Sequence, residues 1–222
     1  MVEISSRNTI PTECGKEILE ALIHVIHKNR QYLSKIDGAI GDGDHGINMD
    51  KGFTRAESLL VDLKESLSLA DAFTGLGEIL LNDIGGSMGP IYGTFFLKMG
   101  EAAKSSMNID KGLFFRMLVQ ARKGLQEIGN AQVGDKTLID TLVAAENALQ
   151  KSIEKGDDSV KALHAMVEGA RSGMESTKEM VAKLGRAARL GERSRGTLDP
   201  GATSCFILLE AMALKTTELF KQ

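Results

Sequence analysis

Three aspartates that could bind a metal ion lie within eight residues of one glycine-rich stretch: Asp37, Asp42 and Asp44. Carboxylates so close together repel one another unless a cation neutralises them, and their oxygens suit Mg²⁺ or Ca²⁺. An EF-hand counted from Asp42 would need glycine and glutamate where Ile47 and Phe53 stand, so that class is excluded. Mg²⁺ combines a few carboxylates with phosphate oxygens and water. The cluster therefore predicts a metal-bridged phosphate, with a polar turn capping the next helix as the alternative.

A second glycine-rich string, Gly85-Gly-Ser-Met-Gly-Pro90, precedes another helical pattern. Free N–H groups at a helix start, with a serine hydroxyl, favour an anion site. The same letters match the nucleophile elbow of α/β-hydrolases, which requires a preceding strand. Leu76 and Leu80 precede it at helical spacing instead, and only His164 follows as a histidine partner. We therefore disfavour a hydrolase.

A third string, Gly129 to Thr137, is a near match to the phosphate-binding P-loop with Asp135 inserted. A P-loop follows a strand, whereas Gly129 follows a helical pattern. Thr137 and Asp140 have the spacing of a helix capping box, which explains both residues structurally.

The fourth stretch, about 185–200, is a basic loop punctuated by glycine. Arginine recognises phosphate because its planar fork binds in a bidentate way. Asp199 before Pro200 is typical of a helix N-cap. The stretch is consistent with a lid that closes over a nucleotide. His45, directly after the aspartate cluster, could contact a phosphate or orient an aspartate.

Helical periodicity in the rest of the chain predicts the elements that position these loops. Apolar residues recur at spacings of three and four, which places each set on one helix face. The sets are Ile18, Leu22, Ile26; Met49, Phe53, Ala56, Leu60, Leu63; Leu69, Phe73, Leu76, Leu80; Phe95, Met99, Ala103; Phe114, Leu118, Ala121, Leu125, Ile128; Leu138, Leu142, Ala145, Leu149; Val160, Leu163, Val167, Ala170, Met174; and Cys205, Leu208, Leu209, Met212. We predict a single all-α domain of about eight helices over residues 1–222, with the glycine loops converging at one end.

Composition excludes several classes of function. The net charge of −3 argues against nucleic-acid binding, which usually needs a basic surplus. Cys14 and Cys205 form no metal motif, and a disulfide framework is implausible. The sequence shows neither a signal-peptide pattern nor an apolar run of about 20 residues. We expect a cytoplasmic protein without membrane contact.

The ordered set of motifs resembles the nucleotide-binding L subunit of dihydroxyacetone kinase, the DhaL family. The strings that carry the resemblance are Ile40-Gly-Asp-Gly-Asp-His-Gly46 with Asn48-Met49, Gly85-Gly86 with Gly89-Pro90, Gly134-Asp-Lys-Thr137 with Asp140, Leu190-Gly-Glu-Arg-Ser194, and Asp199-Pro-Gly-Ala202. They come in the family's order and span most of the chain.

This resemblance implies an eight-helix barrel that holds ADP or ATP at one end, under a lid, with two Mg²⁺ ions on the diphosphate. The implied metal ligands are Asp37, Asp42 and Asp44. The implied nucleotide contacts are His45, Gly46, Ile47, Asn48, Ser87, Met88, Gly129, Leu138, Arg186, Asp199, Pro200 and Gly201. Phosphoryl transfer depends mainly on positioning and charge neutralisation, so no catalytic side chain is assigned to this chain.

The resemblance also implies partners. A separate K subunit would bind dihydroxyacetone through a histidine that this chain lacks, and a phosphocarrier M subunit of the phosphotransferase system would recharge the bound ADP. The alternatives are an ATP-dependent kinase subunit for another short-chain ketose, such as a tetrulose, and a nucleotide-loaded regulatory module. Met88, Arg189 and Thr197 stand where the family often has Ser, Tyr and His, which is compatible with a sub-branch that has another partner or substrate.

Overall fold

A computed structural model describes residues 8–61 and 66–222, and these form eight α-helices. The α-helices are α1 (Gly15–Ile40), α2 (His45–Ala56), α3 (Leu69–Asp83), α4 (Met88–Ala103), α5 (Lys111–Gly129), α6 (Leu138–Glu154), α7 (Ser159–Ser176) and α8 (Pro200–Leu219). Short 3-10 helices are η1 (Glu57–Leu60), η2 (Thr177–Glu179) and η3 (Ala187–Ser194). The all-α prediction is confirmed. Leu63, predicted on the second helix, lies outside the described residues.

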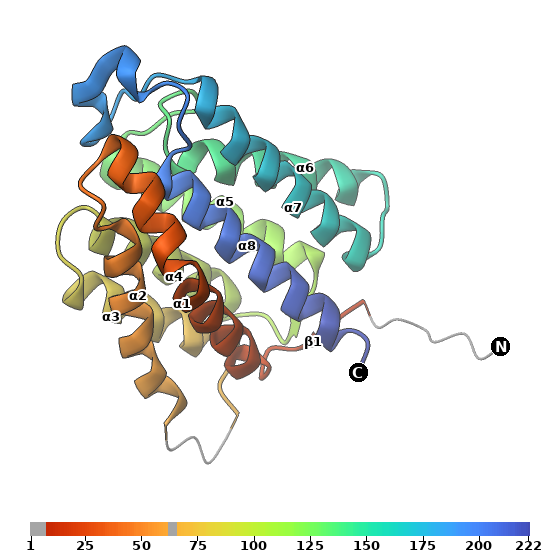
Figure 1. The fold of residues 1–222 in the computed structure, drawn as a ribbon. Helices are drawn as coiled ribbons and strands as arrows, with labels where there is room; N and C mark the ends of the chain where they lie inside the picture. Colours follow the sequence, from red (N-terminus) through yellow and green to blue (C-terminus); the bar gives the residue numbers. More distant parts are fainter. Residues whose placement is uncertain (1–7, 62–65) are drawn as a thin grey trace.

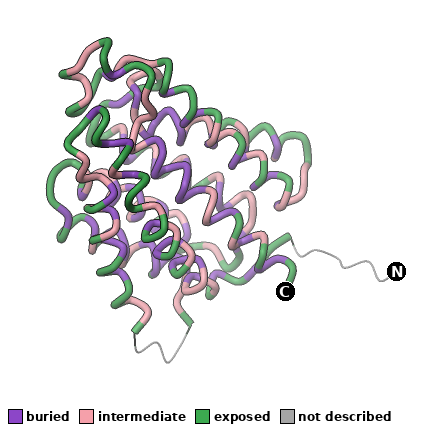
Figure 2. Tube along the Cα trace, in the orientation of Figure 1, coloured by how far each residue is buried: buried purple, intermediate pink, exposed green. Residues whose placement is uncertain are grey.

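Helix α8 lies at the centre of the bundle, packed against α1, α6 and α7 (Figure 1). Every residue from Ala202 to Leu209 is buried, and a helix buried on all sides must be apolar or neutral all round. The outer helices are amphipathic, with buried faces turned inward (Figure 2). Among the described residues, no helix is at once long and apolar enough to cross a bilayer.

Two details differ from the sequence-based expectation. The strands β1 (Ile10–Pro11) and β2 (Asn108–Ile109) pair antiparallel, although we predicted no strand. A two-residue strand is too short for the alternation of buried and exposed residues to show. Ile128 is 52% exposed despite its place in an apolar stripe, because it lies in the last turn of α5 beside the glycine loop.

The loops that follow α1, α3 and α5 lie at one end of the bundle, together with the segment between α7 and α8 (Figure 1). The start of α1 and the C-terminal end of α8 lie at the other end. Helices of similar length that alternate in direction bring every second connection to the same end. The predicted convergence of the glycine-rich loops is therefore present.

His27 connects α1 to α2, the helix that follows the aspartate-rich loop. Its imidazole contacts Asp50 of α2 and Glu57 of η1, at 3.1 Å for the latter. The hydrogen bond to Asp50 raises the pKa of His27, although desolvation of the imidazole acts in the opposite direction. When the pKa of a histidine is higher in the folded state than in the unfolded state, its protonation stabilises the fold. This stabilisation is complete below the pKa of the unfolded state, about 6.5, and is lost as the pH rises through the pKa of the folded state.

We expect His27→Gln to lower the urea midpoint more at pH 6 than at pH 9. The pair is at the surface, so the pH-dependent part is at most about 1 kcal/mol. His24→Gln, an exposed histidine one turn earlier, is the control and should show no such pH dependence. An equal decrease in the urea midpoint at both pH values would mean that the charge of the His27 imidazolium contributes nothing to stability.

Candidate functional site

The three predicted aspartates lie together at the loop end of the bundle. Asp37 is buried in the last turn of α1, and Asp42 and Asp44 follow in the connection to α2. One oxygen from each lies within 4.8 Å of the others. The main-chain N–H of His45 donates to Asp37 Oδ2 at 3.2 Å, which orients that carboxylate. Three converging carboxylates, of which Asp42 and Asp44 are accessible to solvent, fit a hard divalent cation.

Glycine at two positions allows this loop to fold back on α1. A Cβ at Gly41 would overlap the Asp37 carboxylate, and one at Gly46 would overlap the main-chain oxygen of Arg30. Gly41, directly before Asp42, and Gly46, two positions after Asp44, must therefore lack a side chain for the loop to fold back on α1.

Arg186, from the segment between α7 and α8, is the cation that faces the cluster. Its guanidinium pairs with the Asp42 carboxylate and lies 3.7 Å from Asp44. Helix η3 of the same segment packs against α1. The segment predicted as a lid thus covers the aspartate cluster, and its arginine supplies positive charge where the carboxylates gather.

The side chain of His45 points into the bundle and away from the carboxylates. Its Nε2 lies 2.8 Å from the Ser204 hydroxyl of α8, which lies 2.5 Å from the Tyr92 hydroxyl. Burial lowers the pKa of His45 to about 4, although Asp37 opposes the shift. The imidazole is therefore neutral near pH 7 and fixes the start of α2 against α8. Only the main chain of His45 faces the site.

The start of α8 adjoins the start of α6. Asp199 caps α8 by accepting from the Ala202 N–H at 2.7 Å, as predicted. Burial raises the pKa of Asp199 to about 7, against the opposing effect of that N–H. Gly201 faces Leu138 closely, since a Cβ built there would lie 3.7 Å from the Leu138 nitrogen. The predicted capping box of Thr137 and Asp140 starts α6, so these two segments form one wall.

The remaining predicted residues stand apart from this cluster. Ser87 is exposed just before α4, and Met88 packs its side chain partly on the core. Gly129 is exposed at the end of α5. Among the described residues, no hydrogen bond or ion pair joins these three to the aspartates. Helices precede both glycine loops, so neither loop follows the strand that a hydrolase elbow or a P-loop requires.

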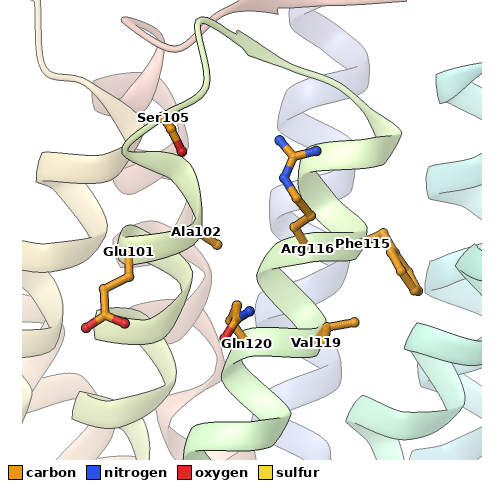
Figure 3. Close-up of a pocket in the computed structure, with 7 residues that line it drawn as sticks. All are labelled: Glu101, Ala102, Ser105, Phe115, Arg116, Val119 and Gln120. Carbon is orange, nitrogen blue, oxygen red and sulfur yellow. The ribbon is translucent and has the colours of Figure 1, made fainter.

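An open cavity of about 340 Å³ lies between α4 and α5 (Figure 3). It is lined by Glu101, Ala102, Ser105, Phe115, Arg116, Val119 and Gln120. These residues come from the end of α4 and the start of α5, so the cavity is at the opposite end from the aspartates. It contains none of the predicted site residues.

Residues 39–214 match the family model described as the DAK2 domain. This chain belongs to the DAK2 domain family. The matched span of this DAK2 domain includes every predicted site residue except Asp37, which lies two positions before it.

Relatives of this DAK2 domain include named kinase subunits. The chain is 37% identical to the ADP-binding subunit DhaL of PEP-dependent dihydroxyacetone kinase 2 from Listeria innocua, covering 88% of this chain and 90% of that one. It is 35% identical to the corresponding DhaL of Escherichia coli, and the alignment covers 93% of this chain and 94% of that one. The dihydroxyacetone kinase of C. freundii with AMP-PNP and Mg²⁺ has the same fold, with a TM-score of 0.66 at 24% identity over 96% of this chain and 36% of that one.

Three further residues shape the site and were missed in the sequence. The Ser204 hydroxyl contacts the imidazole of His45, and the Tyr92 hydroxyl contacts Ser204, as described above. Lys136 is buried beside the start of α6, where it contacts the lid segment. Lys136 stands in the Gly-Asp-Lys-Thr string that we singled out, but a lysine side chain is usually exposed and gave no reason to expect burial.

Proposed function

We propose that this chain is the ADP- and Mg²⁺-binding subunit of a dihydroxyacetone kinase. The observation that carries the proposal is the convergence of Asp37, Asp42 and Asp44 under an arginine at the loop end of a DAK2 domain. Relatives named as ADP-binding subunits match nearly end to end, which supports the same role.

In this proposal the nucleotide occupies the loop end of the bundle, in a domain that spans residues 1–222 with a lid at about 185–200. Asp37, Asp42 and Asp44 hold two Mg²⁺ ions, which would neutralise the phosphates. The nucleotide is contacted by His45, Gly46, Ile47, Asn48, Ser87, Met88, Gly129, Leu138, Arg186, Asp199, Pro200 and Gly201.

The chain's own contribution is positioning. The first turn of α4 presents main-chain N–H groups, which suit a phosphate at a helix start. Arg186 can leave Asp42 for a phosphate, because an exposed ion pair is weak. The wall made by Leu138 and Gly201 would face the rest of the nucleotide. Phosphoryl transfer needs little more from the protein than this orientation and charge compensation.

The proposed reaction is a relay. A phosphocarrier M subunit of the phosphotransferase system phosphorylates bound ADP in the cytoplasm, and the resulting ATP phosphorylates dihydroxyacetone on a separate K subunit. The alternatives are use of free ATP, a tetrulose as acceptor, and a regulatory role without turnover. All three keep the nucleotide site and differ in donor, acceptor or partner.

The relay predicts that one equivalent of bound ADP supports many turnovers. The chain and a K subunit are mixed with excess dihydroxyacetone and with an M subunit labelled with ³²P-phosphate, present in large excess over the chain, and labelled ketose phosphate is measured. We expect product in excess of bound ADP, with no dependence on added ATP.

Turnover on free ATP without the M subunit would contradict the relay and favour the ATP-dependent form. Erythrulose as the preferred acceptor would favour the tetrulose alternative. A chain that neither contains ADP nor binds Mg-ADP would contradict the proposed function altogether.

A further inference from the structure

Lys136 is a charged side chain buried next to the candidate site. It is 1% exposed and lies between α5 and the N-cap of α6, with a left-handed φ of 62°. Burial lowers the pKa of Lys136, with Asp199 as the main opposing charge. A buried ammonium is costly unless polar groups surround it. The groups that surround the Lys136 ammonium should therefore indicate its role.

Four main-chain carbonyl oxygens surround the ammonium of Lys136. Nζ donates to Thr177 at 2.7 Å, to Ser194 at 2.7 Å and to Thr197 at 2.6 Å, and it lies 3.3 Å from the Met180 oxygen. The three short contacts match the three hydrogens of an ammonium group. Because all four partners are carbonyls, the ammonium is held by hydrogen bonds to the main chain.

These carbonyls belong to the two ends of one segment. Thr177 and Met180 follow α7, whereas Ser194 and Thr197 precede α8. The Ser194 hydroxyl joins the same two ends, accepting from the Ala182 N–H at 2.9 Å. Residues 177–183 and 194–199 thus form a fixed base, which we call the lid base.

The part between, residues 184–193, is the lid tip. It begins and ends near Gly185 and Gly191, which have left-handed φ values of 67° and 55°. Such values are accessible to glycine at little cost. The tip carries Arg186, which reaches Asp42. The orientation of Arg186 therefore depends on a base whose two ends meet at the Lys136 ammonium.

We propose that Lys136 is a positioning residue, which clamps the lid base through main-chain carbonyls so that Arg186 is held over the nucleotide site. This inference rests on the proposed function. Lys136 itself does not face the aspartates in this arrangement; its effect on the nucleotide passes through Arg186. A lysine that served only to stabilise the fold would change unfolding without affecting Arg186 in particular.

The test is the release rate of labelled ADP from the Mg-ADP complex of Lys136→Met, followed after excess unlabelled ADP is added. Methionine keeps the apolar stem and the same strain at positive φ, so only the ammonium is removed. We expect release at least about tenfold faster than wild type, from the lost charged hydrogen bonds. The affinity of the aspartates for Mg²⁺ alone should not fall, and it should rise by no more than it does in Arg186→Ala, because a released Arg186 no longer occupies Asp42.

A double-mutant cycle with Arg186→Ala separates positioning from general destabilisation. If Lys136 acts through Arg186, the double variant should release ADP no more than about threefold faster than Arg186→Ala alone, because coupled residues are non-additive. Ser194→Ala loosens the same base and should give the same result, which keeps the test valid if Lys136→Met does not fold. Leu149→Ala, a buried residue on α6 far from the lid, controls for lost stability.

Wild-type release in Lys136→Met, or in Ser194→Ala where the first variant does not fold, would overturn the inference. The inference would also be overturned if the increase in ADP release rate caused by the Lys136 or Ser194 variant multiplied fully with the increase caused by Arg186→Ala. Both outcomes presuppose a wild type that binds Mg-ADP, so they are distinct from failure of the proposed function, in which the wild type binds no nucleotide.

Discussion

Replacing Asp42 by asparagine is expected to remove most of the thermal stabilisation that Mg-ADP gives this protein. A ligand that binds only the folded state stabilises it by about 4 kcal/mol at 1,000 times its dissociation constant. For a chain of this size that corresponds to about 8–16 °C in melting temperature. Asp42 contacts Arg186 and its neighbouring carboxylates rather than the core, so the unliganded variant should melt close to the unliganded wild type.

The measurement is the melting temperature with Mg-ADP and with EDTA. Wild type should lose its stabilisation in EDTA, and Asp42→Asn should show little response to either condition. Glu20→Gln is the control, because it removes one exposed carboxylate from α1 about 26 Å along the helix axis from Asp37. An EDTA response in Asp42→Asn equal to that of wild type would contradict the role of Asp42 as a metal ligand.

The helices of this fold were predictable because nearly every one carries an apolar stripe at helical spacing. The caps were predictable for a similar local reason: Asp199 and Thr137 bond to N–H groups within the next three residues. The second helix was predicted too long, since α2 ends at Ala56 and a 3-10 turn follows. The spacing of Leu60 continues the apolar stripe, but it does not distinguish an α-helix from a 3-10 helix.

The geometry of the candidate site was predictable where its residues are close in sequence and unpredictable where the contact is distant. The aspartate cluster is one loop, so its convergence could be expected from eight residues. The direction of the His45 imidazole depends on Ser204, 159 positions away. The burial of Lys136 depends on carbonyl groups, which every residue possesses and which leave no trace in side-chain types. The division of the lid into base and tip was therefore not visible in the sequence.

Removing the guanidinium of Arg186 is expected to have opposite effects on nucleotide and on metal alone. A charge-assisted hydrogen bond to phosphate contributes about 1.5–3 kcal/mol. Arg186→Ala should therefore release ADP about 10- to 100-fold faster than wild type. Without nucleotide, the same guanidinium occupies Asp42 and competes with Mg²⁺. Its removal should tighten Mg²⁺ binding slightly, by at most about fivefold, because an exposed ion pair contributes about 1 kcal/mol or less.

The two effects are measured separately, by a chase of labelled ADP with unlabelled ADP and by calorimetric titration of the nucleotide-free protein with Mg²⁺. Arg193→Ala is the matched control, since it removes an exposed arginine from the same η3 segment. It should leave both values near those of wild type. Full retention of ADP by Arg186→Ala would show that this arginine is only a solvated charge on the lid. Weaker Mg²⁺ binding in the variant would show that the guanidinium supports the metal site instead of competing with it, because removal of a competitor can only strengthen metal binding.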